Sequence, residues 1–115
     1  MDADFLKQVE QFSNLKTALD TKRKNAFEKA KNNLVFAYAG GLFTADTTTI
    51  LFAKTHSKER ELIMLDNNST PIMIDDIEKF VAKAESSYYE AMNEYHKIYE
   101  ELRTQRSVKK LMSND

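Results

Sequence analysis

The most regular hydrophobic pattern of the chain lies in its C-terminal third. Hydrophobic side chains recur there with alternating gaps of four and three residues, at Ile77, Val81, Ala84, Tyr88, Ala91, Tyr95, Ile98 and Leu102. Such a repeat places these side chains in one stripe along a helix, as in coiled coils. Asp75 and Glu78 have the spacing of a capping box, so we expect a helix from Asp76 to about Val108.

A second, less regular stripe runs through the N-terminal third. It comprises Phe5, Val9, Phe12, Leu15 and Leu19, followed after a polar stretch by Ala26, Phe27, Ala30 and Leu34. These spacings predict another helix, and we favour an end near Asn33. The next segment, 34–39, is rich in β-forming residues and fits either one or two last helical turns or a short strand.

Residues that interrupt regular structure are confined to the middle of the chain. They are two glycines and a single proline, Gly40, Gly41 and Pro71. Farther along, two hydrophobic runs flank the polar segment 66–70, and this pattern predicts a β-hairpin at about 62–74. The segment 66–70 is rich in oxygen atoms, as calcium loops are. It lacks the glycine and final glutamate of an EF-hand, so we interpret it as a turn.

Residues 42–45, directly after the glycine pair, indicate a further strand. The segment 46–58 stays open between two structures, because 47–52 has the composition of a strand whereas Asp46 fits the N-cap of a short helix. The sequence therefore predicts an α+β fold, mainly α, in which two long terminal helices flank a small central β region. We expect residues 1–115 to form a single domain.

Composition narrows the class of protein. The 115 residues are 42% hydrophobic and 30% charged, which is within the globular range. The absence of cysteine excludes disulfide scaffolds, thiolate zinc sites and thiol nucleophiles. The net charge of −1 argues against general coating of nucleic acid. No hydrophobic run reaches the length of a membrane span and Met1–Leu6 lacks a basic start, so we expect no membrane segment and no secretory signal, hence a cytoplasmic location.

The sequence contains no arrangement of residues that is typical of an enzyme. His96 and Glu100 stand four residues apart on the predicted C-terminal helix, but no third ligand is identified, and we interpret them as a surface pair. The pair Gly40-Gly41 is not followed by the lysine and hydroxyl residue of a phosphate-binding loop. We therefore expect a protein that is not an enzyme, with no catalytic residues, no cofactor and no metal site.

The length of the C-terminal helix indicates protein–protein contacts. A helix over 76–108 would be about 50 Å long, whereas a compact globule of this size is about 35 Å across. Either the N-terminal helix folds back along its stripe as an antiparallel partner, or another chain covers the stripe, and we prefer self-association or a larger assembly. The candidate interface residues are Tyr89, Met92, Tyr95, Ile98, Tyr99 and Leu102.

A basic stretch free of acidic residues follows this stripe. It contains Arg103, Arg106, Lys109 and Lys110, which are candidates for contact with phosphate or with an acidic partner. The helix dipole alone favours cations near a helix C-terminus. Since aromatic side chains do not alternate with these cations, nucleic acid is the less favoured partner.

Three segments resemble small proteins of T4-like tailed phages. They are GGLFTAD at 40–46, LDNNSTPIMIDDIEKF at 65–80 and YYEAMNEYHKIYEELRTQR at 88–106. The resemblance covers roughly the last two thirds of the chain and includes no catalytic or binding motif. It implies a virion or assembly component, so the location we expect is cytoplasmic or virion. Separately, the order of helix, small β region and helix is similar to a prefoldin subunit in outline, which implies a chaperone.

The leading hypothesis is a non-enzymatic structural or assembly protein, with the phage virion as its setting. It would act through protein–protein contacts of its long amphipathic helices, as a homo-oligomer or in a larger assembly. A prefoldin-like chaperone subunit and a nucleic-acid-binding accessory protein are the two alternatives.

Overall fold

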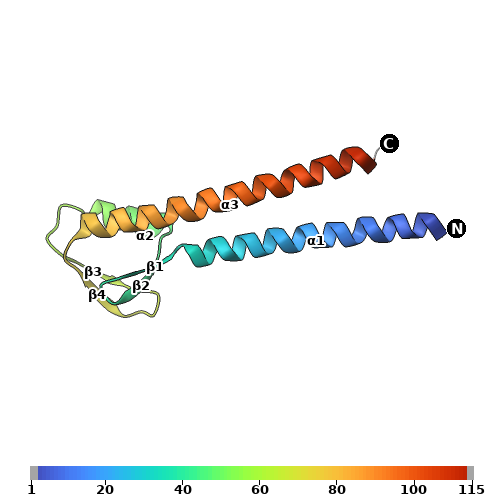
Figure 1. The fold of residues 1–115 in the computed structure, drawn as a ribbon. Coiled ribbons are helices and arrows are strands. Elements are labelled where there is room, and N and C mark those ends of the chain that lie inside the picture. The colour runs from blue at the N-terminus through green and yellow to red at the C-terminus, as the bar shows by residue number, and fades with distance from the viewer. Residues whose placement is uncertain (1–2, 114–115) are drawn as a thin grey trace. The chain divides into compact units, whose positions relative to one another are not determined.

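The computed structural model describes the backbone of residues 3–113 and the side chains of residues 3–105 (Figure 1). Its elements are α1 (Ala3–Asn33), β1 (Val35–Tyr38), β2 (Gly41–Thr44), α2 (Thr47–Thr55), β3 (Leu62–Leu65), β4 (Pro71–Ile74) and α3 (Ile77–Ser113). The protein is 67% helical, and its long first and last helices flank two small antiparallel hairpins. The predicted α+β, mainly α class is confirmed.

The chain divides into two compact units. Unit 1 consists of Met1–Lys29 and Tyr95–Asp115, and unit 2 of Ala30–Glu94. Both long helices contribute residues to both units. The single domain expected over 1–115 stays a prediction.

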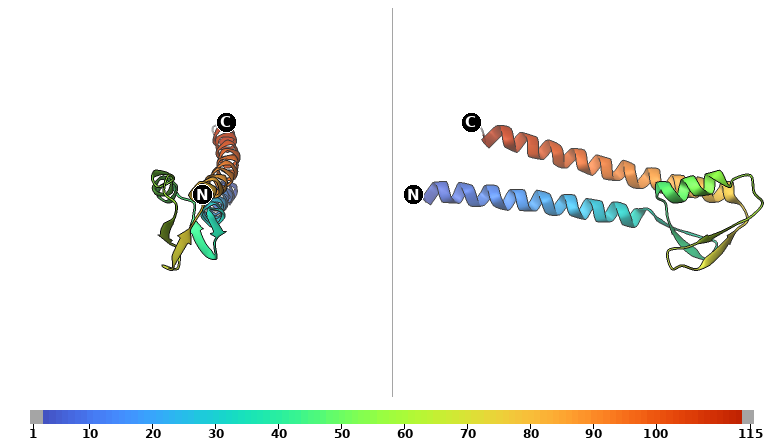
Figure 2. Two further views of the ribbon diagram at one scale, coloured as in Figure 1. Left: turned by 90° about the vertical axis from the view of Figure 1, so that its left-hand side faces the viewer. Right: turned by 180° about the vertical axis from the view of Figure 1, so that it is seen from behind.

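The two hairpins of unit 2 are formed by neighbouring strands in the sequence. The hairpin predicted at 62–74 is confirmed as β3–β4, with Leu62 opposite Ile74. The strand predicted at 42–45 is confirmed as β2, which begins one residue earlier and pairs with β1. Figures 1 and 2 both show the two hairpins on the same side of the N-terminal part of α3.

The segment 34–39, which fitted a helix or a strand, is a strand because a tight turn follows it. Ala39 and Gly40 both have positive φ, 50° and 83°, as the two-residue turns that match the twist of a hairpin require. Gly41 then begins β2 at a close approach of the two hairpins, because a Cβ there would lie 2.9 Å from the Ile72 side chain. α1 ends at Asn33, as predicted.

The open segment 46–58 contains a helix, α2. Asp46 is its N-cap, and the Asp46 carboxylate accepts a hydrogen bond from the Thr49 N–H at 2.7 Å. The fully buried Ala45 and Ala53 anchor this helix in the core of unit 2. An ion pair of 2.8 Å between Lys54 and Glu85 joins its surface to that of α3.

The predicted start of the C-terminal helix is wrong by one residue. α3 begins at Ile77, and Asp76, not Asp75, is the residue whose carboxylate accepts from the Lys79 N–H, at 3.0 Å. Because β4 continues to the buried Ile74, Asp75 is needed to connect the strand to the helix. This start brings both Ile77 and Phe80 into the core.

A cluster of aromatic rings packs β1–β2 against α3. The ring of Phe80 is fully buried, and its centroid lies 5.5 Å from that of Phe36, 5.2 Å from that of Tyr38 and 5.0 Å from that of Phe43. Contacts of this kind add about 0.5–1.5 kcal/mol each to the burial of the rings. Since two-stranded hairpins are marginally stable in water, this cluster supplies the support that β1–β2 lacks by itself.

The Asp66 carboxylate joins the two hairpins. One oxygen accepts from the N–H groups of Asn68 and Thr70, both at 2.9 Å, and the other accepts from the N–H of Leu42 on β2 at 3.1 Å. The Asn67 N–H donates to the Leu42 carbonyl at 2.7 Å. The interpretation of 66–70 as a turn is confirmed. The backbone N–H of Thr70, with those of Leu42 and Asn68, lowers the pKa of Asp66.

Phe80→Ala is expected to lower the free energy of unfolding by about 3–5 kcal/mol, because it leaves a cavity among three aromatic rings. Urea denaturation followed by circular dichroism measures this change. Leu51→Ala is the control, since the Leu51 side chain on α2 is 64% exposed and its truncation should change stability by less than about 1 kcal/mol. Equal losses for the two variants would contradict the placement of Phe80.

Asp66→Asn is expected to lower the melting temperature at neutral pH, because an amide offers one acceptor oxygen and no charge. The pKa of Asp66 is lowered in the folded state. The contribution of the carboxylate is therefore complete above its unfolded pKa of about 4 and is lost as the pH falls through the lowered folded value.

The difference in melting temperature between wild type and Asp66→Asn should thus shrink in acid. Glu59→Gln is the control, since it removes an exposed carboxylate in the turn after α2. A difference for Asp66→Asn that stays constant across the titration contradicts the role of its charge.

Candidate protein interface

In unit 1 the C-terminal part of α3 packs antiparallel to α1. The rings of Phe27 and Tyr95 are 6.0 Å apart, in an edge-to-face arrangement. One turn earlier on α1, the guanidinium of Arg23 lies 5.7 Å from the ring of Tyr99, which is one turn later on α3. The contacts thus move backward along α1 as they move forward along α3, which happens only when two helices run antiparallel. Of the two predicted ways to cover the stripe, the folding back of the N-terminal helix therefore holds in unit 1.

The shared seam of this helix pair is short and well buried. Leu19 and Ala26 of α1 and Leu102 of α3 are buried, and the register set by the ring contacts places Leu19 close to Leu102 along the pair. Part of the hydrophobic stripe of α3 is therefore covered by the chain itself.

The predicted interface residues of unit 1 differ in accessibility. Leu102 is buried, and Tyr95 and Ile98 are half-buried. Tyr99 keeps 38% of its surface exposed, with the Arg23 guanidinium over its ring. Among these four residues, Tyr99 offers the most surface to a partner.

Unit 2 contains the other two predicted interface residues, Tyr89 and Met92. Met92 is half-buried, whereas Tyr89 is 58% exposed, and its ring centroid lies 5.7 Å from that of the neighbouring Tyr88 in an edge-to-face arrangement. The pattern assigned Tyr88 to packing, and Tyr88 does pack partly against the core. Tyr89 is therefore the accessible member of this pair.

A larger accessible surface lies on α1, where no interface was predicted. Phe5, Leu6, Val9 and Phe12 are each about half exposed, between 49% and 55%, and together we call them the α1 stripe. The hydrophobic pattern placed three of them on one face with Leu15 and Leu19, and Phe5, Phe12 and Leu19 follow one another at intervals of seven residues. Their position around the helix does not distinguish Phe5 and Phe12 from the buried Leu19, so the pattern alone gives no signal for their exposure.

The outer face of β3–β4 is a second apolar surface. Ile63 and Met73 are opposite each other in the ladder, and both are among the exposed hydrophobic residues, together with Leu65. The alternate residues of the same strands, Met64 and Ile74, are buried in the core. The hairpin is therefore apolar on both faces, with one face in water.

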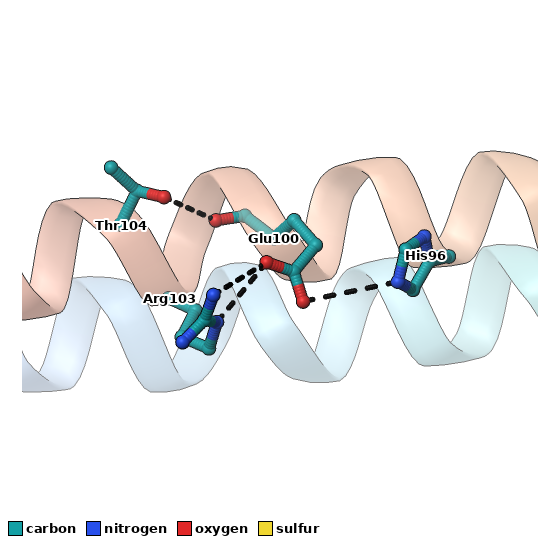
Figure 3. A network of polar contacts seen from close by, with 4 residues as sticks. All are labelled: His96, Glu100, Arg103 and Thr104. Carbon is teal, nitrogen blue, oxygen red and sulfur yellow. Dashed lines mark hydrogen bonds and ion pairs between the residues drawn. The ribbon is translucent and has the colours of Figure 1, made fainter.

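The predicted basic site begins at a residue that already has an acidic partner. Arg103 donates two hydrogen bonds to one carboxylate oxygen of Glu100, at 3.1 and 2.9 Å (Figure 3). The other oxygen lies 3.8 Å from a ring nitrogen of His96. These contacts with Glu100 raise the pKa of Arg103 above its ordinary value. Because all three side chains are accessible to water, such pairs add little stability.

Contact of this stretch with nucleic acid stays a prediction. The side chains of the other basic candidates, Arg106, Lys109 and Lys110, lie outside the described residues. His96 and Glu100 form the surface pair expected from the sequence, and the described residues hold no cluster of three metal-binding side chains.

Comparison with known proteins finds no relative that indicates a function, so a proposal of function rests on the geometry of this chain. The chain matches no protein-family model, and no curated protein or solved structure is significantly similar to it. In the part of the chain that the structure describes, no helix has both the length and the hydrophobicity to cross a membrane.

Leu102→Ala is expected to cost about 2–5 kcal/mol of stability in unit 1, because it leaves a cavity in the buried seam. Hydrogen exchange in mild urea should show faster exchange of amides in 15–29 and 95–105, with smaller changes in the hairpins. Tyr89→Ala, at an exposed position of the same helix, is the control and should leave unit 1 unchanged. Equal effects of the two variants would exclude the seam described for Leu102.

Proposed function

We propose that this protein is a non-enzymatic structural or assembly protein that acts through protein–protein contacts of its long helices, in a virion or in its assembly. The observation that carries this proposal is the α1 stripe, four neighbouring hydrophobic side chains that are half exposed. A buried phenylalanine covers about 150–250 Å², so the four side chains expose roughly 350 Å². A patch of this size reaches that of the largest apolar patch of a typical monomer, which is often functional.

The setting in a virion or its assembly rests on the resemblance of 40–46, 65–80 and 88–106 to proteins of T4-like tailed phages. A virion component needs stable contacts with other subunits more than a reactive centre. The division of hydrophobic residues between a covered seam and an accessible stripe suits that need. A cytoplasmic location before assembly is compatible with the same role.

The α1 stripe should determine the size of the species in solution. Wild type is expected to sediment as an oligomer at micromolar concentration or to retain a protein partner during purification. Val9→Asp combined with Phe12→Asp should release monomers, because burial of the new charges costs far more than burial of the replaced side chains yields. The matched control is Gln11→Asp with Asn14→Asp, which adds the same charge at exposed positions on the opposite side of α1.

The same sedimentation experiment contains the contrary outcome. A wild type that stays monomeric at micromolar concentration and yields no partner in a pull-down would exclude the proposal. Equal dissociation by the control pair would locate the effect in net charge and not in the stripe.

A prefoldin-like chaperone is a second candidate, favoured by one observation. The chain order places two β-hairpins and a short helix between two long helices that run antiparallel in unit 1. Half-exposed hydrophobic residues on α1 would then contact unfolded clients. A holdase suppresses aggregation of an unfolded enzyme at near-stoichiometric ratio, and loss of suppression in the Val9→Asp, Phe12→Asp variant would support this candidate. Unchanged aggregation at a molar excess of wild type would exclude it.

A further inference from the structure

The two hairpins of unit 2 have an apolar outer surface. In each strand, the residues that alternate with the buried core positions face water, and the large hydrophobic ones among them are 40–66% exposed. An antiparallel sheet with one face in water normally has polar residues on that face. The exposed hydrophobic residues, which we call the hairpin face, are Val35, Leu42, Ile63, Leu65 and Met73.

The outer sides of the two hairpins adjoin each other. The Thr44 hydroxyl of β2 donates to the side-chain oxygen of Asn67 at 3.2 Å, and both residues continue the outward alternation of their strands. On the inner side, Gly41 approaches the Ile72 side chain. Because outer residues meet outer residues and inner residues meet inner ones, the exposed side chains of both hairpins lie on the same side of unit 2.

We propose that the hairpin face packs against the hairpin face of a second copy of the chain, so that the hairpins of the two copies form a sandwich. Contacts across a twofold axis bring the same surface of both copies together, so a charged patch would repel its own image. The strands of the hairpin face, 35–38, 41–44, 62–65 and 71–74, contain no charged residue. Two hairpin faces can therefore meet without burying like charges.

Glu61 and Asp75 determine the direction of this packing. They continue the register of β3–β4 by one residue at its open end, and both are exposed. The other end of the hairpin is a turn whose exposed residues, 67–70, are uncharged. If the open ends of two copies coincided, four carboxylates would lie close together.

A twofold axis across the strands avoids this repulsion, because it places the open end of each copy over the turn of the other. The two acidic ends are then about 20 Å apart along the strands, well beyond the screening distance of about 8 Å at physiological salt. In this arrangement Ile63 of one copy lies opposite Leu65 of the other.

The exposed area fits a weak dimer. A large aliphatic side chain has up to about 120 Å² of apolar surface, so the five partly exposed residues offer roughly 300 Å². Two faces supply about 600 Å² of apolar contact, and the whole interface is about 1,000 Å² at an apolar fraction of about 60%. This area is at the lower limit for a specific interface, so we expect a dimer that forms above about 0.1 mM.

This inference goes beyond the proposed function, because it names a second contact surface that does not involve the α1 stripe. The Val9→Asp, Phe12→Asp variant isolates the hairpin face, since it removes the contact proposed for that stripe. The variant should be monomeric at micromolar concentration and should sediment as a dimer at about 0.5 mM.

Met73→Asp, added to this variant, should keep it monomeric at the higher concentration, because face-to-face packing would bury the new charge. Ser86→Asp adds the same charge at an exposed position of α3, and this control should leave the dimer intact. Circular dichroism and thermal melting verify that each variant stays folded.

Disulfide crosslinking reports the direction and does not depend on a destabilising charge, since the chain contains no cysteine of its own. In the same variant, a mixture of Ile63→Cys and Leu65→Cys should form the mixed disulfide in several-fold excess over a mixture of Ile63→Cys and Met73→Cys. The second pair lies opposite each other only if the acidic ends coincide.

Four results would overturn this packing. A variant that stays monomeric at the higher concentration excludes the dimer and leaves the proposed function intact, because that function is tested with wild type at micromolar concentration. A dimer that survives Met73→Asp means that the edge of β3 pairs and not the face. Equal dissociation by Ser86→Asp locates the effect in net charge, and an excess of the Ile63–Met73 disulfide means the opposite direction.

Discussion

A pair of helices can bury only the side chains along its shared seam, and this limit decides which hydrophobic residues of the protein stay in contact with water. In unit 1 the seam contains Leu19 and Ala26 of α1 and Leu102 of α3. Phe12 and Phe5 precede Leu19 by seven and fourteen residues, yet both are half exposed. Part of the hydrophobic surface of α1 is therefore accessible, and the proposed role in assembly rests on that surface.

Unit 2 depends on a related limit, since a two-stranded hairpin cannot bury enough surface to be stable alone. Phe80 gives β1–β2 a hydrophobic support, and the Asp66 carboxylate links the turn of β3–β4 to β2. Apolar packing thus holds the hairpins against α3, while three backbone N–H groups on one carboxylate hold them to each other.

The sequence predicts what local pattern controls. Both long helices, the hairpin at 62–74 and the strand at 42–45 follow from spacing and turn residues. The strand β1 depends on a turn with positive φ at Ala39, and an alanine in the sequence gives no signal for such a turn. The helix α2 forms in a segment with the composition of a strand, because Asp46 caps it and Ala53 is buried. Accessibility is harder still. Leu102 and Phe12 both belong to regular stripes, yet one is buried and the other half exposed, because exposure depends on the register between helices.

Intermolecular nuclear Overhauser effects test the central claim most directly. In an equimolar mixture of isotope-labelled and unlabelled chains, a filtered experiment detects only contacts between copies. The account predicts contacts between copies that involve the Val9 methyl groups and the rings of Phe5 and Phe12. If the protein is oligomeric at the concentration used and the mixture shows no such contacts, the α1 stripe is not the contact surface and the account is wrong.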